Sequence, residues 1–107
     1  MTTTIERQII IGALRLLDSP EKWCKNTLQQ TGPDGQRQYC IRGALYKATA
    51  MLGFSVKNGG PQLQKADYLL AKTFGPRVGL YPHVDFQNRP DTTFDQMRAL
   101  LHKALAI

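Results

Sequence analysis

The chain has few of the residues that bind metals. Its 107 residues include two cysteines, Cys24 and Cys40, and two histidines, His83 and His102. Neither pair has the short spacing of zinc ligands, and a structural zinc site needs four ligands that are usually paired in this way. The sequence therefore predicts no metal site, and it contains no motif that calls for a cofactor.

Long hydrophobic runs are also missing. The apolar run Ile9–Ile11 is followed by Gly12 and Arg15, which leaves it far short of the roughly 20 apolar residues of a membrane span. No basic segment leads into an apolar stretch, as it would in a secretory signal. We therefore expect a cytoplasmic protein with no membrane partner, in which Cys24 and Cys40 stay reduced.

Clusters of basic residues are missing as well, although the net charge is +6. No two Lys or Arg residues are adjacent, and acidic residues are spread among them. A nucleic-acid interface usually gathers such residues on one face or along one helix. The charge keeps nucleic-acid binding as an alternative hypothesis, which predicts an affinity that falls steeply with salt.

Apolar residues make up 42% of the chain, enough for one core in a chain of this length. We expect a single domain over residues 1–107. Apolar residues at three- and four-residue spacing predict helices over about 4–17, 38–52, 61–74 and 93–105. Another helix is expected to begin at Pro20 and to carry Trp23 and Leu28. The predicted fold class is all-α, with four or five short helices.

Several helix ends have recognisable caps. Thr3 with Glu6, and Thr93 with Gln96, have the spacing of capping boxes at the first and last helices. Gly53 follows the apolar stripe of 38–52 and is suited to a left-handed C-terminal position. These signals set the expected helix boundaries.

Residues 75–92 have the least regular pattern. Apolar residues alternate there as in an extended strand, but Pro82 interrupts the alternation. A connection this long without regular structure is uncommon in a compact domain and is often functional. We predict one long extended loop whose apolar side chains plug the core. Four side chains are expected to face outward and bind a partner: Tyr81, His83, Asp85 and Arg89.

Two short motifs, Trp23-Cys24 and Tyr39-Cys40, each place a cysteine after an aromatic residue. The dipole of the helix that begins near Cys40 would favour its thiolate, so Cys40 is a candidate reactive thiol. We favour the competing interpretation, in which both cysteines are small buried side chains that seal a helix contact. Gly43 is expected to admit a close helix–helix approach, with the Trp23 indole as the expected neighbour.

No set of nucleophile, base and orienting group is complete. His83 and Asp85 would face the same way in an extended segment, which suits a base and its orienting acid. No sequence feature brings them to Cys40. The sequence therefore favours a protein that is not an enzyme.

Taken together, these motifs resemble those of a family of small bacterial and phage proteins of unknown function. The family pattern joins Trp-Cys, Cys-x-x-Gly-Ala, a Trp- or Phe-Asn-Asp-x-Pro segment and a Thr-capped final helix. Residues 23–24, 40–44 and Thr93 match three of these elements. The remaining element reads Phe-Gln-Asn-Arg-Pro at 86–90, with amides where the pattern has Asn and Asp. Asn88 can still accept hydrogen bonds from loop or helix-start amides, whereas a role that requires a carboxylate is lost.

The resemblance supports the helical fold and implies no activity. The leading hypothesis is a binding module that acts by protein–protein contact, through the segment 77–90 and the neighbouring helix ends. The bacterial and phage character of the family suggests an accessory or inhibitory protein of a phage or mobile element, by analogy alone. Nucleic-acid binding and thiol chemistry at Cys40 are the alternatives.

Overall fold

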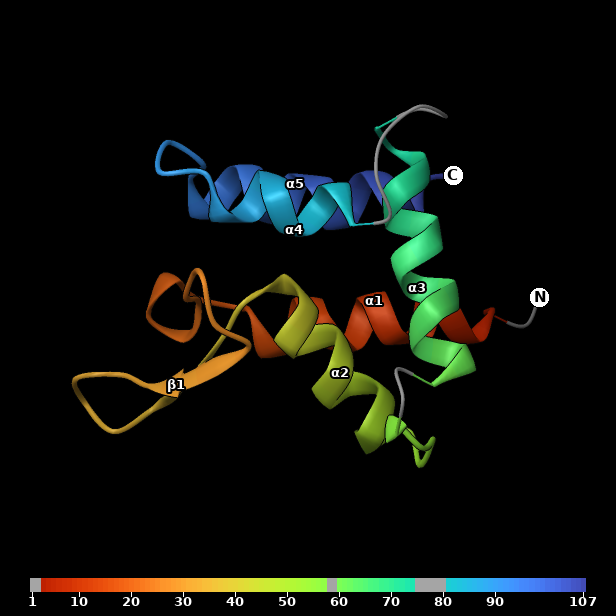
Figure 1. Ribbon diagram of the computed structural model, residues 1–107, viewed down its shortest axis with the longest axis horizontal. Coiled ribbons are helices and arrows are strands. Elements are labelled where there is room, and N and C mark those ends of the chain that lie inside the picture. Colours follow the sequence, from red (N-terminus) through yellow and green to blue (C-terminus); the bar gives the residue numbers. More distant parts are fainter. Residues whose placement is uncertain (1–2, 58–59, 75–80) are drawn as a thin grey trace.

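Five α-helices and a β-hairpin form the described part of the computed structural model, residues 3–57, 60–74 and 81–107 (Figure 1). The helices are α1 (Ile5–Leu16), α2 (Ile41–Met51), α3 (Pro61–Lys72), α4 (Pro82–Asn88) and α5 (Phe94–Leu105). The short 3-10 helix η1 (Pro20–Lys22) and the strands β1 (Gln29–Thr31) and β2 (Arg37–Tyr39) lie between α1 and α2. The predicted small domain of mostly helical structure is confirmed.

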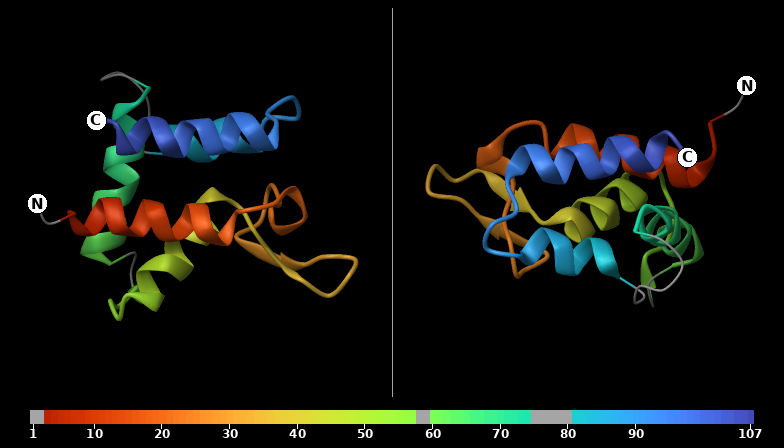
Figure 2. Two further views of the ribbon diagram at one scale, coloured as in Figure 1. Left: turned by 180° about the vertical axis from the view of Figure 1, so that it is seen from behind. Right: turned by 90° about the horizontal axis from the view of Figure 1, so that it is seen from above.

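The helix α1 contacts α2, α3 and α5. The helix α3 crosses the ends of α1 and α5, and the hairpin projects from the opposite end of the molecule (Figures 1 and 2). The short helix α4 packs against α2 and α3. None of the helices in the described ranges is long and apolar enough to cross a lipid bilayer.

One cluster of buried apolar side chains, drawn from α1, α2, α3 and α5, forms the core. The largest of these that are fully buried are Ile9, Ile10, Leu17, Ile41, Leu45, Leu63, Leu70, Met97 and Leu101. Burying each such side chain contributes about 1.5–3 kcal/mol relative to leaving it in water. The apolar stripes that predicted the four longer helices therefore meet in the core for most of their length, whereas Met51 and Leu52, at the end of the α2 stripe, were expected to be buried and are exposed.

The cap of α5 is confirmed as predicted. The N–H of Gln96 donates to Thr93 Oγ1 at 3.1 Å, and the N–H of Thr93 donates to Gln96 Oε1 at 2.9 Å. These bonds satisfy two of the amides that a helix start leaves without partners. Gly53 also has the expected left-handed backbone just after α2, with φ of +90°.

The cap predicted for α1 is wrong by one residue. Thr4 is the N-cap, and its hydroxyl accepts a hydrogen bond from the N–H of Arg7. Glu6 lies one position too early to close a capping box with Thr4. It remains in the first turn of α1, where a carboxylate is favoured by the helix dipole.

The helix predicted to begin at Pro20 is wrong, since only the single turn of η1 forms there. Trp23 is extended and forms an isolated parallel bridge with Tyr39. Asn26 has φ of +65°, a left-handed conformation that no right-handed helix accommodates. The following residues form the antiparallel pair β1–β2, in which Gln30 faces Gln38. The spacing from Trp23 to Leu28 is five residues and makes no helical stripe.

The extended loop predicted for 75–92 is also wrong where the structure describes it, because Pro82–Asn88 is the helix α4. Pro82 suits the first helical position, where no backbone donor is needed. Val84 and Phe86 gave the segment its strand-like alternation, yet both are only half-buried. Residues 75–80 of the predicted loop lie outside the described residues.

Gly43 does admit a close approach, but its neighbour is not the expected Trp23 indole. A Cβ atom at Gly43 would lie 1.7 Å from the carbonyl oxygen of Leu28. That carbonyl also accepts a hydrogen bond from the N–H of Cys40 at 3.2 Å. The chain before the hairpin therefore crosses directly over the first turn of α2.

We expect Gly43→Ala to lower the free energy of unfolding by about 3 kcal/mol, because the added methyl overlaps a backbone carbonyl. In an unobstructed helix the same change raises stability by about 1 kcal/mol, so the sign of the effect is diagnostic. Urea unfolding measures it. Ala50→Gly, at an exposed position of the same helix, is the control and should cost about 1 kcal/mol. A Gly43→Ala protein as stable as the wild type would contradict the close approach.

Candidate functional site

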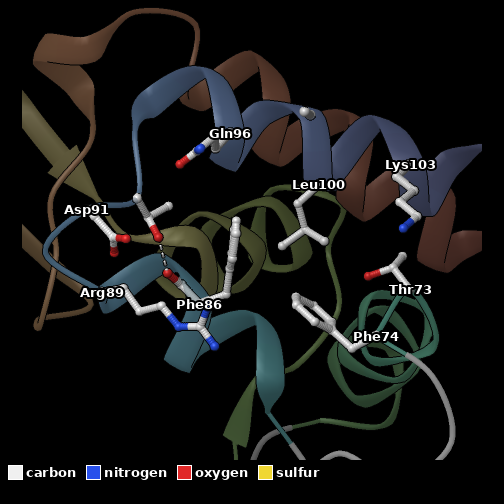
Figure 3. A pocket seen from close by; sticks show the side chains of 10 residues that line it. Thr73, Phe74, Phe86, Arg89, Asp91, Gln96, Leu100 and Lys103 are labelled. Atoms are coloured by element: carbon white, nitrogen blue, oxygen red, sulfur yellow. Dashed lines mark hydrogen bonds between the residues drawn. The ribbon is translucent and has the colours of Figure 1, made fainter.

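A pocket of about 430 Å³ lies between the end of α3, the helix α4 with the turn that follows it, and α5 (Figure 3). We call it the α4–α5 pocket. Its lining residues are Thr73, Phe74, Phe86, Arg89, Asp91, Thr92, Gln96, Ala99, Leu100 and Lys103.

Aromatic and aliphatic side chains line the interior of the α4–α5 pocket. The rings of Phe74 and Phe86 meet edge to face, with their centroids 5.8 Å apart. Leu100 points toward the same space from α5 (Figure 3). This surface suits an apolar group of a ligand.

Charged side chains lie on opposite sides of this apolar surface. Arg89 and Asp91 come from the turn after α4, and Lys103 comes from the last turn of α5 (Figure 3). The guanidinium of Arg89 lies 5.8 Å from the centroid of the Phe86 ring, close enough for a cation–π contact. Neither Arg89 nor Lys103 forms an ion pair with any of the described residues. The described lining of the pocket therefore carries two cations and one carboxylate.

The turn that carries Arg89 is held in place by hydrogen bonds. The hydroxyl of the buried Thr92 donates to the carbonyl of Phe86 at 2.6 Å, the bond dashed in Figure 3. Lys25 Nζ donates to the carbonyl oxygens of Arg89 and Thr92, the latter at 2.8 Å. The rim of the pocket is therefore fixed by Lys25, which is distant in the sequence.

Two segments that resemble the family pattern, around 23–26 and 86–90, are joined by hydrogen bonds. We call this set of hydrogen bonds the amide clasp; its members are Trp23, Asn26, Ile41, Gln87 and Asn88. The fully buried Gln87 accepts from the indole N–H of Trp23 at 2.6 Å and from the N–H of Ile41 at 3.1 Å. The Ile41 amide is one of those that a helix start leaves unpaired. Asn88 Oδ1 accepts from the N–H of Asn26 at 2.9 Å, which confirms its expected role as an acceptor for a loop amide.

A buried carboxylate links α2, α3 and α4. Asp67 Oδ2 accepts from Arg42 Nη2 at 3.1 Å, and Asp67 Oδ1 lies 2.8 Å from Nε2 of His83. The Asp67 side chain is only 5% exposed. The centroid of the Tyr81 ring lies 4.5 Å from the Arg42 guanidinium carbon, close enough for a cation–π contact. We call Arg42, Asp67, Tyr81 and His83 the Asp67 cluster.

His83 is fully buried, so the expectation that it faces outward is wrong. Its orienting acid is Asp67, whereas Asp85 is exposed at the surface. The His83 Nδ1 has no hydrogen-bond partner among the described residues, so Asp67 alone orients the ring by hydrogen bonding there. His83 presents no surface to solvent, and the Asp67 cluster joins α2, α3 and α4 through these contacts.

The four residues predicted to bind a partner thus lie in different environments and do not form one surface. Arg89 lines the α4–α5 pocket, Tyr81 is 41% exposed above Arg42, Asp85 is exposed outside that pocket, and His83 is buried. Sequence reasoning missed Asp67, although its position among the apolar residues of α3 was a usable signal. A carboxylate on the buried face of a helix needs a partner.

Both cysteines are free and buried, as the favoured interpretation expects. Cys40 is the N-cap of α2, and its sulfur accepts from the N–H of Gly43 at 3.3 Å. Burial raises the pKa of the Cys40 thiol, although hydrogen bonds from the Gly43 and Arg42 amides oppose the shift. Burial, with a smaller repulsion from Cys40, raises the pKa of Cys24 to about 11. The burial and the direction of this shift oppose the alternative hypothesis of a reactive Cys40 thiol with a lowered pKa.

Metal ligands do not gather in the described residues. No group of three or more His, Cys, Asp or Glu side chains lies close enough there to hold a metal ion. His83 and His102 belong to different helices, and the Nε2 atom of His83 is hydrogen-bonded to Asp67.

We expect Asp67→Ala to lower the free energy of unfolding by about 3–5 kcal/mol, because Arg42 and His83 would lose their shared buried partner. Chemical denaturation of the two proteins gives the difference. Asp85→Ala removes the same group from an exposed position and should change stability by no more than about 0.5 kcal/mol. Equal effects of the two substitutions would rule out a structural role for the Asp67 cluster.

The raised pKa of Cys24 predicts a loss of stability in alkali. The unfolded thiol ionises near its ordinary pKa of 9.0, whereas the folded one resists ionisation until about 11. The stabilisation that the protonated Cys24 thiol contributes to the folded state is therefore complete below pH 9.0 and declines as the pH rises toward 11. Urea midpoints measured across this range should fall more steeply for wild type than for Cys24→Ala. Parallel pH profiles would show that the thiol does not contribute.

No curated protein and no solved structure matches this chain. One family model does match, over residues 1–107, and its description is a family of unknown function, DUF6197. The match covers all four elements on which the resemblance was based, including the segments that form the amide clasp. The expected relationship to a family of unknown function is thereby confirmed: the chain belongs to DUF6197.

Proposed function

We propose that this protein is a non-enzymatic binding module that recognises another protein through the α4–α5 pocket. The observation that carries this proposal is the pairing of an apolar interior with two cations that have no ion-pair partner among the described residues. Such a pocket suits an apolar side chain flanked by carboxylates. The Arg89 guanidinium can bind a carboxylate with two parallel hydrogen bonds, and Lys103 supplies a second positive charge.

The lining of the pocket favours binding over catalysis. It contains two hydroxyl side chains, Thr73 and Thr92, and each donates its proton to a backbone carbonyl. Among the described residues that line it there is no histidine or cysteine, and Asp91 is the single acid. A nucleophile without a neighbouring base is weakly reactive. These features support a role in recognition.

The proposed site overlaps the surface expected from the sequence, since α4 and the turn after it provide Phe86, Arg89, Asp91 and Thr92. An accessory or inhibitory role in a phage or mobile element, and a cytoplasmic location, remain predictions from the sequence.

Nucleic-acid binding is a second candidate, and one observation favours it. Tyr68 on α3 is 66% exposed, and the Lys72 ammonium lies 4.7 Å from the centroid of its ring. Lys65 lines the same shallow surface. An exposed ring beside two lysines can stack on a base while the cations meet phosphates. Glu6 lines this surface too and opposes such binding, so we place this candidate second.

Thiol chemistry at Cys40 has little support from the geometry. The sulfur is buried and is used as a helix cap, and burial raises its pKa. A reactive cysteine requires an accessible thiolate.

The α4–α5 pocket can be tested with a photo-crosslinking amino acid in place of Gln96, expressed in cells of the source organism. We expect a protein adduct that survives nuclease treatment and moderate salt. Arg89→Glu together with Lys103→Glu should reduce adduct formation by about tenfold or more, because both charges that attract the partner are reversed. Both side chains are exposed, so thermal unfolding should change little.

A crosslinker at Gln30 in the hairpin is the matched control, since that side chain lies outside the pocket. Equal adducts from positions 30 and 96 would contradict the proposal. Adducts that disappear with nuclease or with moderate salt would favour the α3 nucleic-acid surface instead.

A further inference from the structure

A second concave surface lies between α1 and α2, on different helices from those of the α4–α5 pocket. Its volume is about 560 Å³. We call it the α1–α2 groove, and its lining residues are Thr3, Gln8, Ile11, Gly12, Arg15, Leu16, Ala48, Met51 and Leu52.

The α1–α2 groove exposes large apolar side chains beside one another. Met51 is 66% exposed and Leu52 is 42% exposed, both at the end of α2. Ile11 and Leu16, which are half-buried, form the facing wall on α1. Contiguous apolar surface of this kind marks interaction sites, and the flexible Met side chain adapts to different partner shapes.

Small residues make the floor of the groove. A Cβ atom at Gly12 would lie 2.9 Å from the Cβ of Ala48, so the two helices approach closely at this point. Neither Gly12 nor Ala48 has a long side chain to fill the space above the floor. The groove therefore has room for side chains of a partner.

Positive charge accompanies this apolar surface. Among the described residues that line the groove, Arg15 is the one charged residue, and Lys47 lies a turn before Met51 on the exposed side of α2. The sequence of α2 contains no acidic residue. A partner with acidic residues beside its apolar ones would complement this surface, whereas a second copy of this chain would bring further positive charge from its own +6.

The helical walls of the groove also indicate which secondary structure a partner would present to it. Extended peptides gain affinity by hydrogen bonding to the open edge of a sheet, and both walls here are helices whose backbone groups bond within the helix. The groove thus offers side-chain contacts. An amphipathic helix supplies such contacts from residues spaced three and four apart.

We propose that the α1–α2 groove docks an amphipathic helix of a partner protein, with an apolar stripe against Ile11, Leu16 and Met51 and acidic residues toward Arg15. This site is separate from the α4–α5 pocket and does not depend on the function proposed for that pocket.

A displayed library of helix-forming peptides of roughly 16 residues, about four turns, tests the groove with defined probes. We expect selection on the wild-type protein to enrich peptides that combine an apolar stripe with flanking Asp or Glu. Arg15→Glu should weaken these peptides by about tenfold and should favour versions in which the acids are replaced by Lys. Met51→Gln, which leaves the charge unchanged, should weaken the binding of the acidic peptides and of their Lys versions by about fivefold or more.

Arg37→Glu makes the same charge change on the exposed hairpin and should leave peptide affinity nearly unchanged. Thermal unfolding of each variant verifies that the fold is retained. Failure to enrich any peptide, enrichment of basic peptides, or binding that is indifferent to Met51→Gln would overturn the proposal. So would a wild-type dimer in sedimentation that Met51→Gln converts to monomer, since the occupant would then be a second copy.

Discussion

The carboxylate of Asp67 holds the position of α4, and the α4–α5 pocket depends on that position. It is buried between Arg42 of α2 and His83 of α4, so it joins three helices through one side chain. The amide clasp secures the other end of α4, where Gln87 binds Trp23 and the start of α2. A helix of seven residues is too short to be stable alone, so these polar contacts supply what its own length does not.

The consequence for function is that the buried polar groups and the exposed ones have different roles. In the Asp67 cluster and the amide clasp, the polar side chains of Asp67, His83 and Gln87 are buried and are used in contacts between helices and loops. In the α4–α5 pocket, the side chains available to a partner are Arg89, Lys103 and the aromatic surface between them. A scaffold that fixes a turn and leaves its cations unpaired within the described residues is suited to recognition. This division supports the binding module that we propose.

The sequence was sufficient to predict the helices that have a continuous apolar stripe, since α1, α2, α3 and α5 all contribute most of that stripe to one core, with Met51 and Leu52 at the end of α2 as exposed exceptions. It failed where tertiary contacts decide the backbone. Trp23 looked helical because Pro20 precedes it, but its indole and the chain after it are held by Gln87 and Asn88, more than sixty residues away. In the pocket, Arg89 was predicted, whereas Lys103 and Phe74 were not, because no local pattern shows which distant residues will share a surface.

Hydrogen exchange across α4 is the most direct test of how the site is built. Asp67→Asn keeps the shape of the side chain but removes its charge, so it weakens the contacts with Arg42 and His83 selectively. We expect amides in a peptide covering residues 81–92 to exchange faster in this variant, while those of α1 and α5 keep their protection. Unchanged exchange over 81–92, or an equal loss of protection in every helix, would show that Asp67 does not position α4.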